Sequence, residues 1–234
     1  MTNHLLNFLH VVGTKLCLSS CKLVIYGMYG STCTQRVLMA ALENGAEYEL
    51  RLVDIRKDEQ KHAQHLARQP FGQIPALEDG DTTLYESRAI CRYIDYTRGG
   101  ALTPTDVKKR ALMEQWISLE QGTITPEIAG VVSQCVFAPI FGRKTDEDAV
   151  KKHAENAQQG LDVMDQHLAT NEYLAGDIFT LADIFYIPFF TWSLRSPEKH
   201  LLQSRNNIMR WLNAVTSRSS WKEVAKLSEF TGGK

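Results

Sequence analysis

Residues 70–81 read Pro-Phe-Gly-Gln-Ile-Pro-Ala-Leu-Glu-Asp-Gly-Asp, an apolar run that ends in an acidic, glycine-containing turn. A turn of this kind between two short apolar segments is typical of a β-hairpin. Thr82–Tyr85 supplies the second strand, and Glu86-Ser87 then opens a helical pattern with apolar residues at Ile90 and Ile94. The stretch therefore predicts an antiparallel hairpin followed by a helix.

Upstream of this stretch, residues 22–27 form a β-type run, Lys-Leu-Val-Ile-Tyr-Gly. Apolar residues recur at helical spacing from Val37 to Leu42 until Asn44-Gly45 ends the pattern, and Tyr48–Ile55 alternates as a strand does. A strand, a helix and a strand joined by short links indicate parallel strands with a right-handed crossover. With a polar loop and short helix at 56–69, the order predicts a thioredoxin-like α/β domain over residues 22–97.

The remainder of the chain reads as helical after a linker at residues 98–104, which contains Gly99, Gly100 and Pro104. Apolar residues between Ala154 and Leu168 step by three and four, which predicts a stripe that packs on other helices. Residues 105–234 are therefore expected to form an all-α helical bundle.

Thr180 and Asp183 flank the start of a strongly apolar helical run in this second domain. A hydroxyl at the N-cap and a carboxylate three residues later can each accept a hydrogen bond from a backbone N–H that the helix leaves unpaired. Asp183 is therefore interpreted as a capping residue rather than a catalytic one.

The composition excludes several classes of protein. A formal charge of −1 over 234 residues does not indicate a nucleic-acid-binding protein. The five cysteines include no CxxC pair, which favours reduced thiols and a cytoplasmic location. No run of 18 or more apolar residues predicts a membrane span. Residues 1–21 match a secretory signal poorly and are expected to be a disordered extension, which leaves organelle targeting open.

Ser31 lies where the first strand gives way to the first helix. Helix starts expose N–H groups and attract anions, including thiolates. Lowering a thiol pKa from about 8.5 to about 6–7 requires roughly 2–3 kcal/mol of thiolate stabilisation, which one hydroxyl donor and the helix end can supply. The alternative interpretation is that Ser31 simply caps the helix.

Other polar side chains lie close to Ser31. Cys33 is a rival because helix starts lower thiol pKa values, although a buried, inert thiol is the expected state. Tyr26 offers a hydroxyl, but its place in an apolar run favours packing. Thr32 and Thr34 are candidate caps.

Two further positions have groups suited to peptide recognition. Ile74-Pro75 is a candidate cis peptide, which would expose the Ile74 backbone to an extended peptide. Gln73 beside it carries an amide suited to peptides or carboxylates. At the next helix start, the Ser87 hydroxyl can hold a carboxylate and Glu86 an ammonium, although both could merely cap the helix.

Taken together, these segments resemble the glutathione transferases, specifically the serine-type phi class. The resemblance runs from about Lys22 to about Leu227. Its most specific pieces are residues 70–76, 78–81 and 84–90 in the first domain and 173–177 and 179–183 in the second. The resemblance implies the glutathione transferase fold: a thioredoxin-like domain followed by an all-helical one.

The resemblance also implies a role for particular residues. Ser31 corresponds to the catalytic serine of the phi class. The residues implied to bind glutathione are Gln60 and Lys61 at its glycine end, Gln73 and Ile74 at the cysteinyl backbone, and Glu86 and Ser87 at the γ-glutamyl group. Pro75 corresponds to the family's cis proline. The implied electrophile pocket draws on Met28, Tyr29, Phe137 and Ile140.

The implied function is conjugation of glutathione to hydrophobic electrophiles, with reduction of organic hydroperoxides as a possible second reaction. Glutathione is the co-substrate, no other cofactor and no metal is expected, and the family usually forms homodimers. Two alternatives stay open: a non-catalytic carrier or regulatory protein on the same fold, and a thiol oxidoreductase that depends on Cys33.

Overall fold

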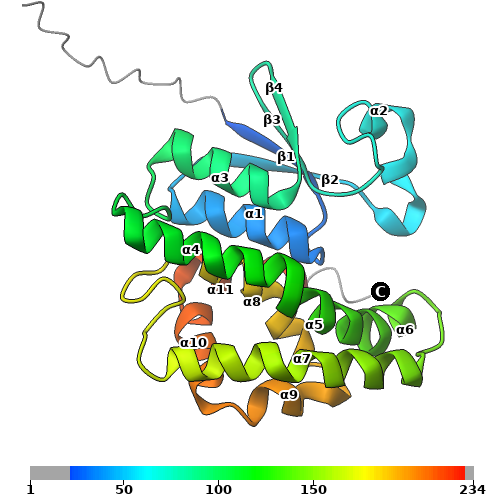
Figure 1. Cartoon of the computed structure of the whole chain (residues 1–234). Helices are drawn as coiled ribbons and strands as arrows, with labels where there is room; N and C mark the ends of the chain where they lie inside the picture. Colours follow the sequence, from blue (N-terminus) through cyan, green and yellow to red (C-terminus); the bar gives the residue numbers. More distant parts are fainter. Residues whose placement is uncertain (1–21, 230–234) are drawn as a thin grey trace, which may run out of the picture.

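The computed structural model describes residues 22–229. A four-stranded sheet with two long helices on one face packs on a larger helical part (Figure 1). The extension predicted for residues 1–21 lies outside the described residues. The thioredoxin-like plus all-helical fold is confirmed.

The sheet has the order β2-β1-β3-β4. β1 pairs with β2 in parallel, and β3 pairs with β1 and β4 antiparallel, as the sequence predicts. The strands are β1 (Leu23–Gly27), β2 (Tyr48–Leu52), β3 (Ala76–Asp79) and β4 (Thr82–Tyr85). β2 ends before Ile55, because the Asp54 carboxylate accepts a hydrogen bond from the Arg56 N–H and starts a 3₁₀ turn there.

Two helices lie between the sheet and the helical part, α1 (Thr32–Glu43) and α3 (Ser87–Arg98) (Figure 1). Their buried side chains, such as Leu38 and Ile90, belong to the same apolar core as side chains of the helical part. The short segments η1 (Ile55–Lys57), η2 (Glu59–Lys61) and α2 (Ala63–Leu66), together the α2 segment, lie beside the sheet. Of these, η1 borders the helical part, where Ile55 and Arg56 line a cavity with Phe137 and Ile140. The two domains therefore share one core, and the α2 segment does not.

The helical part is built on α4, α5, α7 and α8: α5 packs on α7 and α8, α4 packs on α8, and α8 packs on α1. π-helical turns interrupt the first long helix at two points, and Pro126 and Pro139 stand at the first turn of the helices that follow them. The elements are α4 (Val107–Leu119), η3 (Glu120–Ile124), α5 (Thr125–Val132), η4 (Ser133–Phe137), α6 (Ala138–Ile140), α7 (Glu147–Leu168), α8 (Leu181–Ser193), η5 (Pro197–Lys199), α9 (His200–Gln203), α10 (Asn206–Thr216) and α11 (Ser219–Glu229).

The continuous helical run Val107–Ile140 is long and apolar enough to cross a membrane by length and composition, with a mean hydropathy of 1.2 over an 18-residue window. No such run is predicted from the sequence. One helix of this kind is weak evidence for a membrane span, because core helices pass the same test. Here α5, within the run, packs against α7 and α8.

The start of α8 confirms the capping role predicted for Asp183. Its fully buried carboxylate accepts hydrogen bonds from the Thr180 N–H at 2.9 Å, the Leu174 N–H at 3.1 Å and the Trp211 indole N–H at 2.8 Å. Burial raises the pKa of Asp183 to about 6, against the opposing effect of these hydrogen bonds. Asp183 therefore joins α8, α10 and the preceding loop.

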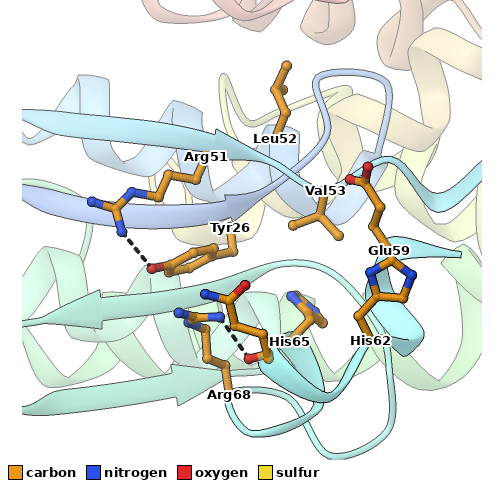
Figure 2. Close-up of a pocket in the computed structure, with 9 residues that line it drawn as sticks. Tyr26, Arg51, Leu52, Val53, Glu59, His62, His65 and Arg68 are labelled. Atoms are coloured by element: carbon orange, nitrogen blue, oxygen red, sulfur yellow. Dashed lines mark hydrogen bonds between the residues drawn. The ribbon is translucent and has the colours of Figure 1, made fainter. Parts of the chain in front are cut away.

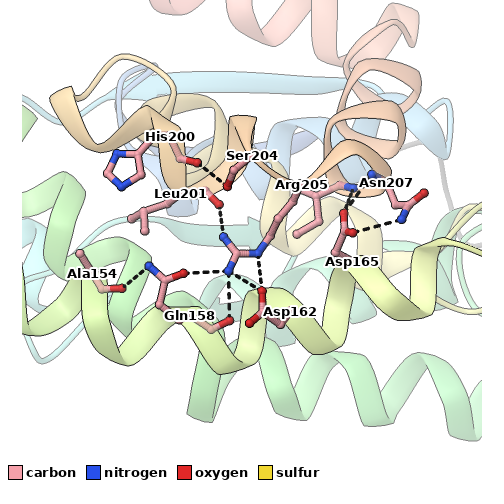
Figure 3. A network of polar contacts seen from close by, with 10 residues as sticks. Ala154, Gln158, Asp162, Asp165, His200, Leu201, Ser204, Arg205 and Asn207 are labelled. Atoms are coloured by element: carbon pink, nitrogen blue, oxygen red, sulfur yellow. Dashed lines mark hydrogen bonds and ion pairs between the residues drawn. The ribbon is translucent and has the colours of Figure 1, made fainter.

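A second polar network holds α7 against α9 and α10 (Figure 3). Arg205 is 8% exposed and donates to the Asp162 carboxylate at 2.9 Å and to the Gln158 side chain at 2.8 Å. Asp165, one turn further along α7, accepts from the Asn207 N–H at 2.9 Å. This network lies in the helical part and fixes helix packing rather than a ligand site.

Candidate active site

Strand register brings three predicted site segments to one edge of the sheet. Tyr26 near the end of β1 pairs with Ala76 at the start of β3, and Ala76 pairs with Tyr85 at the end of β4. The loop to Ser31 leaves β1 at this edge, residues 73–75 enter β3 there, and Glu86-Ser87 leave β4 there. Site segments from Ser31 to Ser87, far apart in the sequence, thus lie together at one end of the sheet.

Ser31 is the N-cap residue of α1. Its Oγ accepts a hydrogen bond from the Thr34 N–H at 3.3 Å, at the long end of the normal range. A serine hydroxyl that accepts one hydrogen bond still has a proton to donate. The first turn of α1 carries no acidic side chain that would neutralise the positive end of the helix. Ser31 is half-buried, and it faces a cavity.

Gly27 allows the end of β1 and the start of α1 to approach closely. A Cβ at this position would lie 2.5 Å from Thr34 Oγ1 and 2.8 Å from its methyl carbon. Thr34 is buried, and its hydroxyl accepts a hydrogen bond from the Met28 N–H at 3.4 Å. Thr34 thus fixes the loop between Met28 and Ser31 rather than capping the helix.

The loop before β3 contains the predicted cis peptide. Ile74-Pro75 is cis, the Gln73 side chain is exposed and Ile74 is half-buried. The Lys61 ammonium donates to the Phe71 carbonyl at 3.2 Å. Gly72 adopts a φ of +62°, and a Cβ there would lie 2.7 Å from the Lys61 side chain. The segment carrying Gln60-Lys61 and the loop carrying Gln73-Ile74 therefore touch, as a shared peptide site requires.

Gln60 has one polar group without a partner. Its side-chain N–H donates to Asp58 at 3.3 Å, but its carbonyl oxygen is buried and has no hydrogen-bond partner among the described residues. A buried, unpaired acceptor is costly unless a ligand or water supplies a donor.

At the start of α3, the Glu86 side chain is exposed to solvent. Ser87, the next residue, is buried and 5% exposed. Glu86 has a φ of +73° and a ψ of 109°, and makes no capping hydrogen bond with its side chain. A residue other than glycine in this backbone region costs about 1–3 kcal/mol, and such residues cluster at functional sites. The carboxylate is therefore free for a ligand.

A buried ion pair network anchors this helix start to the helical domain. Arg88, directly after Ser87, donates to both oxygens of the Glu120 carboxylate at 2.7 and 2.8 Å. Arg36 of α1 donates to the same carboxylate at 2.6 Å, and both Arg36 and Glu120 are almost fully buried. Breaking a buried pair of this kind is strongly destabilising. The relative position of α1, α3 and the start of η3 is thus fixed beneath the site.

The cavity in front of Ser31 has a volume of about 250 Å³ and lies between the two domains. The predicted pocket residues Met28, Phe137 and Ile140 line it. Tyr29 does not line this cavity, contrary to the prediction: it packs against the apolar core, and its carbonyl accepts from the Gln35 side chain at 3.0 Å. The other lining residues are Gly30, Thr32, Ile55, Arg56, Phe141, Trp192 and Ser228.

A second cavity, of about 310 Å³, separates the α2 segment from the sheet (Figure 2). Tyr26 lies on its sheet side, where its hydroxyl donates to Glu78 at 2.8 Å and accepts from Arg51 at 2.9 Å. Burial raises the pKa of Glu78, but the hydrogen bonds from Tyr26 and Arg68 outweigh burial and leave it below its ordinary value. Tyr26 is 7% exposed, and its hydroxyl both donates and accepts a hydrogen bond within the protein, in agreement with the packing role predicted for it.

Comparison with known proteins identifies the family to which this chain belongs. The glutathione S-transferase N-terminal domain model matches residues 21–96, and the C-terminal domain model matches residues 124–219. Glutathione S-transferase F11 of Arabidopsis thaliana is 39% identical over 210 residues, which cover 88% of this chain and 98% of the relative. The chain belongs to the glutathione S-transferase family.

Solved glutathione transferases have the same fold. Glutathione transferase F7 from Populus trichocarpa superposes with a TM-score of 0.85 at 35% identity, covering 88% of this chain and 99% of that one. Maize glutathione S-transferase I, solved in complex with an atrazine glutathione conjugate, superposes with a TM-score of 0.83 at 31% identity, covering 89% and 98%. The chain is thus a glutathione transferase that uses glutathione as co-substrate.

In this glutathione transferase the cysteines differ in environment. Cys91 is fully buried, and burial raises the pKa of its thiol far above the ordinary value. Cys33 is half-buried rather than buried as expected, although its neighbours Thr32 and Thr34 in the first turn of α1 are buried. Cys33 does not line the cavity in front of Ser31.

Sequence reasoning missed the contribution of distant helices to the transferase pocket. Trp192 of α8 packs edge-on against Phe137 with ring centroids 5.3 Å apart, and Ser228 of α11 donates to the Tyr29 carbonyl at 2.9 Å. Trp192 lies near the end of α8, beyond the strongly apolar start of that helix, and is half-buried. A tryptophan at such a position is a signal for a partly exposed pocket wall.

Proposed function

We propose that this glutathione transferase is a serine-type, phi-class enzyme that conjugates glutathione to hydrophobic electrophiles. One observation carries the proposal: the Ser31 hydroxyl stands at the positive end of α1, donates to no group within residues 22–229, and faces a largely apolar cavity. A thiolate beside it gains a hydrogen bond and the field of the helix. Ser31 then acts as a donor to sulfur, not as a base or nucleophile.

Glutathione is an extended peptide with charged groups at both ends, and the residues at this edge of the sheet suit each part. Its glycine carboxylate meets the Lys61 ammonium, and the unpaired Gln60 carbonyl oxygen accepts from a peptide N–H. The cysteinyl backbone pairs with Ile74 beside Gln73, as an added strand does. The γ-glutamyl carboxylate takes the Ser87 hydroxyl and the helix N–H groups, and its ammonium takes Glu86.

The apolar cavity supplies the second substrate site. Met28, Phe137, Ile140 and Trp192 remove apolar surface of the electrophile from water and hold it beside the sulfur. With a chloronitrobenzene, the thiolate forms a C–S bond to the ring carbon that carries chlorine, and chloride leaves. The thiol proton has already gone to solvent. A maize relative solved with an atrazine glutathione conjugate supports this class of reaction.

The same thiolate can reduce an organic hydroperoxide. Attack on the peroxide oxygen breaks the O–O bond, releases the alcohol after proton uptake and leaves glutathione sulfenic acid. A second glutathione then forms the disulfide and releases water. This reaction needs no additional group from the protein, so it depends on the same Ser31.

A homodimer is the assembly we propose. The side chain of Phe71 is 65% exposed and makes an edge contact with Tyr85, and Tyr96 is 55% exposed. Neighbouring exposed apolar groups can mark an interaction surface, and Phe71 and Tyr85 are neighbours of this kind. Phe71→Ser should shift the sedimentation coefficient towards the monomer, whereas Leu52→Ser, at the opposite edge of the sheet, should not. An unchanged coefficient for Phe71→Ser would remove Phe71 from the interface.

The proposal on Ser31 is tested by conjugation of a chloronitrobenzene. Wild type and Ser31→Ala are assayed at saturating glutathione, and the variant is expected to retain about 1% of the activity, since loss of one charge-assisted hydrogen bond costs about 2–3 kcal/mol. Equal activity in the two proteins would take Ser31 out of the mechanism. Binding of a hydrophobic dye without turnover of any electrophile would favour the carrier alternative.

A further inference from the structure

His65 makes a hydrogen bond to the backbone of the loop before Pro75. It lies in α2 and is 4% exposed, and its Nε2 is 2.7 Å from the Gln73 carbonyl oxygen. A carbonyl can only accept, so Nε2 carries a proton and donates it to this bond. Nδ1 is buried and has no hydrogen-bond partner among the residues that the structure describes. The ring therefore keeps one costly unpaired atom while its other nitrogen holds the loop.

Gln69 holds the same residue from the other side. Its side-chain oxygen accepts from the Gln73 N–H at 3.0 Å, and Gln69 is 2% exposed. Its own carbonyl accepts from the Gly72 N–H at 3.0 Å. Both backbone groups of Gln73 are thus occupied by buried side chains, while the Gln73 side chain remains exposed.

Apolar packing does little to hold this segment in place. The cavity of about 310 Å³ between α2 and the sheet is lined by His65, His62 and Glu59 on one side and by Tyr26 and Val53 on the other (Figure 2). The apolar cluster on this face of the sheet contains few residues and is separate from the main core. The orientation of the loop before Pro75 therefore depends on a small number of polar contacts.

We propose that His65 is a positioning residue for glutathione. Its Nε2–H holds the Gln73 carbonyl, with Gln69 on the Gln73 N–H, so that the Gln73 side chain and the Ile74 backbone meet the cysteinyl part of the tripeptide in one orientation. His65 does not touch glutathione. The inference rests on the proposed function, because it needs residues 73–74 to bind the peptide.

The test compares His65→Leu, which removes the donor at similar volume, with His65→Gln, which retains a side-chain N–H. His62→Leu is the matched control, because His62 lines the same cavity, is exposed and is not the histidine that bonds the loop. Binding of S-hexylglutathione is measured by calorimetry, and KM for glutathione, KM for a chloronitrobenzene and kcat are measured by assay. Urea unfolding of each variant is followed in parallel.

We expect His65→Leu to raise the Kd for S-hexylglutathione and the KM for glutathione roughly three- to tenfold, the loss that one hydrogen bond implies. kcat and KM for the electrophile should stay within twofold, because Ser31 is on α1 and not on this loop. His65→Gln should recover most of the affinity, and His62→Leu should match wild type.

Two results would overturn the inference. One is unchanged glutathione affinity in His65→Leu. The other is a fall in kcat, affinity and unfolding free energy together that His65→Gln does not reverse, because this would show a purely structural role. Failure of the proposed function itself is separate: wild type would then neither bind S-hexylglutathione nor turn over the electrophile.

Discussion

The helix starts of α8 and α1 each use a side-chain oxygen as a cap, and they use it differently. At α8, Asp183 is fully buried, and its carboxylate is occupied by N–H groups from three segments. At α1, Ser31 is half-buried, and its oxygen accepts one long hydrogen bond of 3.3 Å. Its hydroxyl proton is donated to no group within the described residues. From sequence alone the two positions look alike, because each provides a side-chain oxygen that can cap the start of an apolar helix.

The difference shows how a cap can be separated from a reactive group. A saturated, buried cap contributes to folding and has no capacity left for a ligand. A cap with a spare donor that faces a cavity contributes little to folding and can serve a substrate. We therefore expect changes at α8 to affect stability and changes at α1 to affect activity.

The largest effect is expected from Asp183→Ala. Removing the carboxylate leaves the Leu174, Thr180 and Trp211 N–H groups buried without an acceptor, which should lower the free energy of unfolding by roughly 3–5 kcal/mol. The measurement is urea unfolding. The control is Asp146→Ala at the exposed start of α7, where the carboxylate accepts from the Ala149 N–H at 3.0 Å, and where about 1 kcal/mol should be lost. Equal losses at the two positions would contradict the account of α8.

Ser31→Ala is expected to produce the opposite profile. Its kcat/KM for a chloronitrobenzene should fall about 100-fold, equivalent to about 2.7 kcal/mol. Its free energy of unfolding should fall by less than about 1 kcal/mol, because the capping hydrogen bond is long and Ser31 is half-exposed. Ser31→Thr, which keeps a hydroxyl, should retain more activity than the alanine variant. A stability loss as large as that of Asp183→Ala would erase the contrast between the two caps.

The pKa of Asp183 gives the α8 cap a dependence on pH. Because burial raises this pKa from 3.8 to about 6, the folded protein holds the carboxyl proton at a pH where the unfolded chain has lost it. The stability contribution of Asp183 is therefore greatest below about pH 4 and declines as the pH rises through about 6, by on the order of 3 kcal/mol in total.

This decline is measured by comparing unfolding free energies between pH 4.5 and 7. Wild type should lose more stability over this range than Asp183→Asn, which cannot titrate. Parallel curves for the two proteins would show that Asp183 does not titrate in this window.

Cys33→Ser should have the smallest effect. Cys33 is half-buried but does not line the cavity in front of Ser31, so conjugation activity should change less than twofold. Mass spectrometry of the oxidised protein is the complementary measurement. A mixed disulfide with glutathione at Cys33, together with loss of thiol-transfer activity in the serine variant, would support the thiol oxidoreductase alternative instead.

Much of the fold could be predicted from local patterns. The hairpin at residues 76–85 and the parallel pair β1 and β2 follow from alternation, turn residues and short links, and the α8 cap follows from the Thr180-x-x-Asp183 spacing. The end of β2 could not be placed, because the Asp54 carboxylate starts a 3₁₀ turn where the apolar alternation appeared to continue.

The candidate site was only partly predictable for a physical reason. Strand register determines which loops meet at the same edge of the sheet. For this reason Ser31, Gln73 and Ser87 could be grouped. The apolar wall depends on how α8 and α11 lie over α1, and neither periodicity nor spacing reports that. For this reason Trp192 and Ser228 were missed, and Tyr29 was placed in the pocket rather than against the core.

The most direct test of the Ser31 account is titration of the thiol of bound glutathione, followed by the ultraviolet absorbance of the thiolate. In wild type we expect the bound thiol to ionise with a pKa of about 6–7, against about 8.5 for a free thiol, and in Ser31→Ala we expect it to move at least about one unit back towards the free value. A bound thiol in wild type that ionises at the same pH as free glutathione would contradict the account.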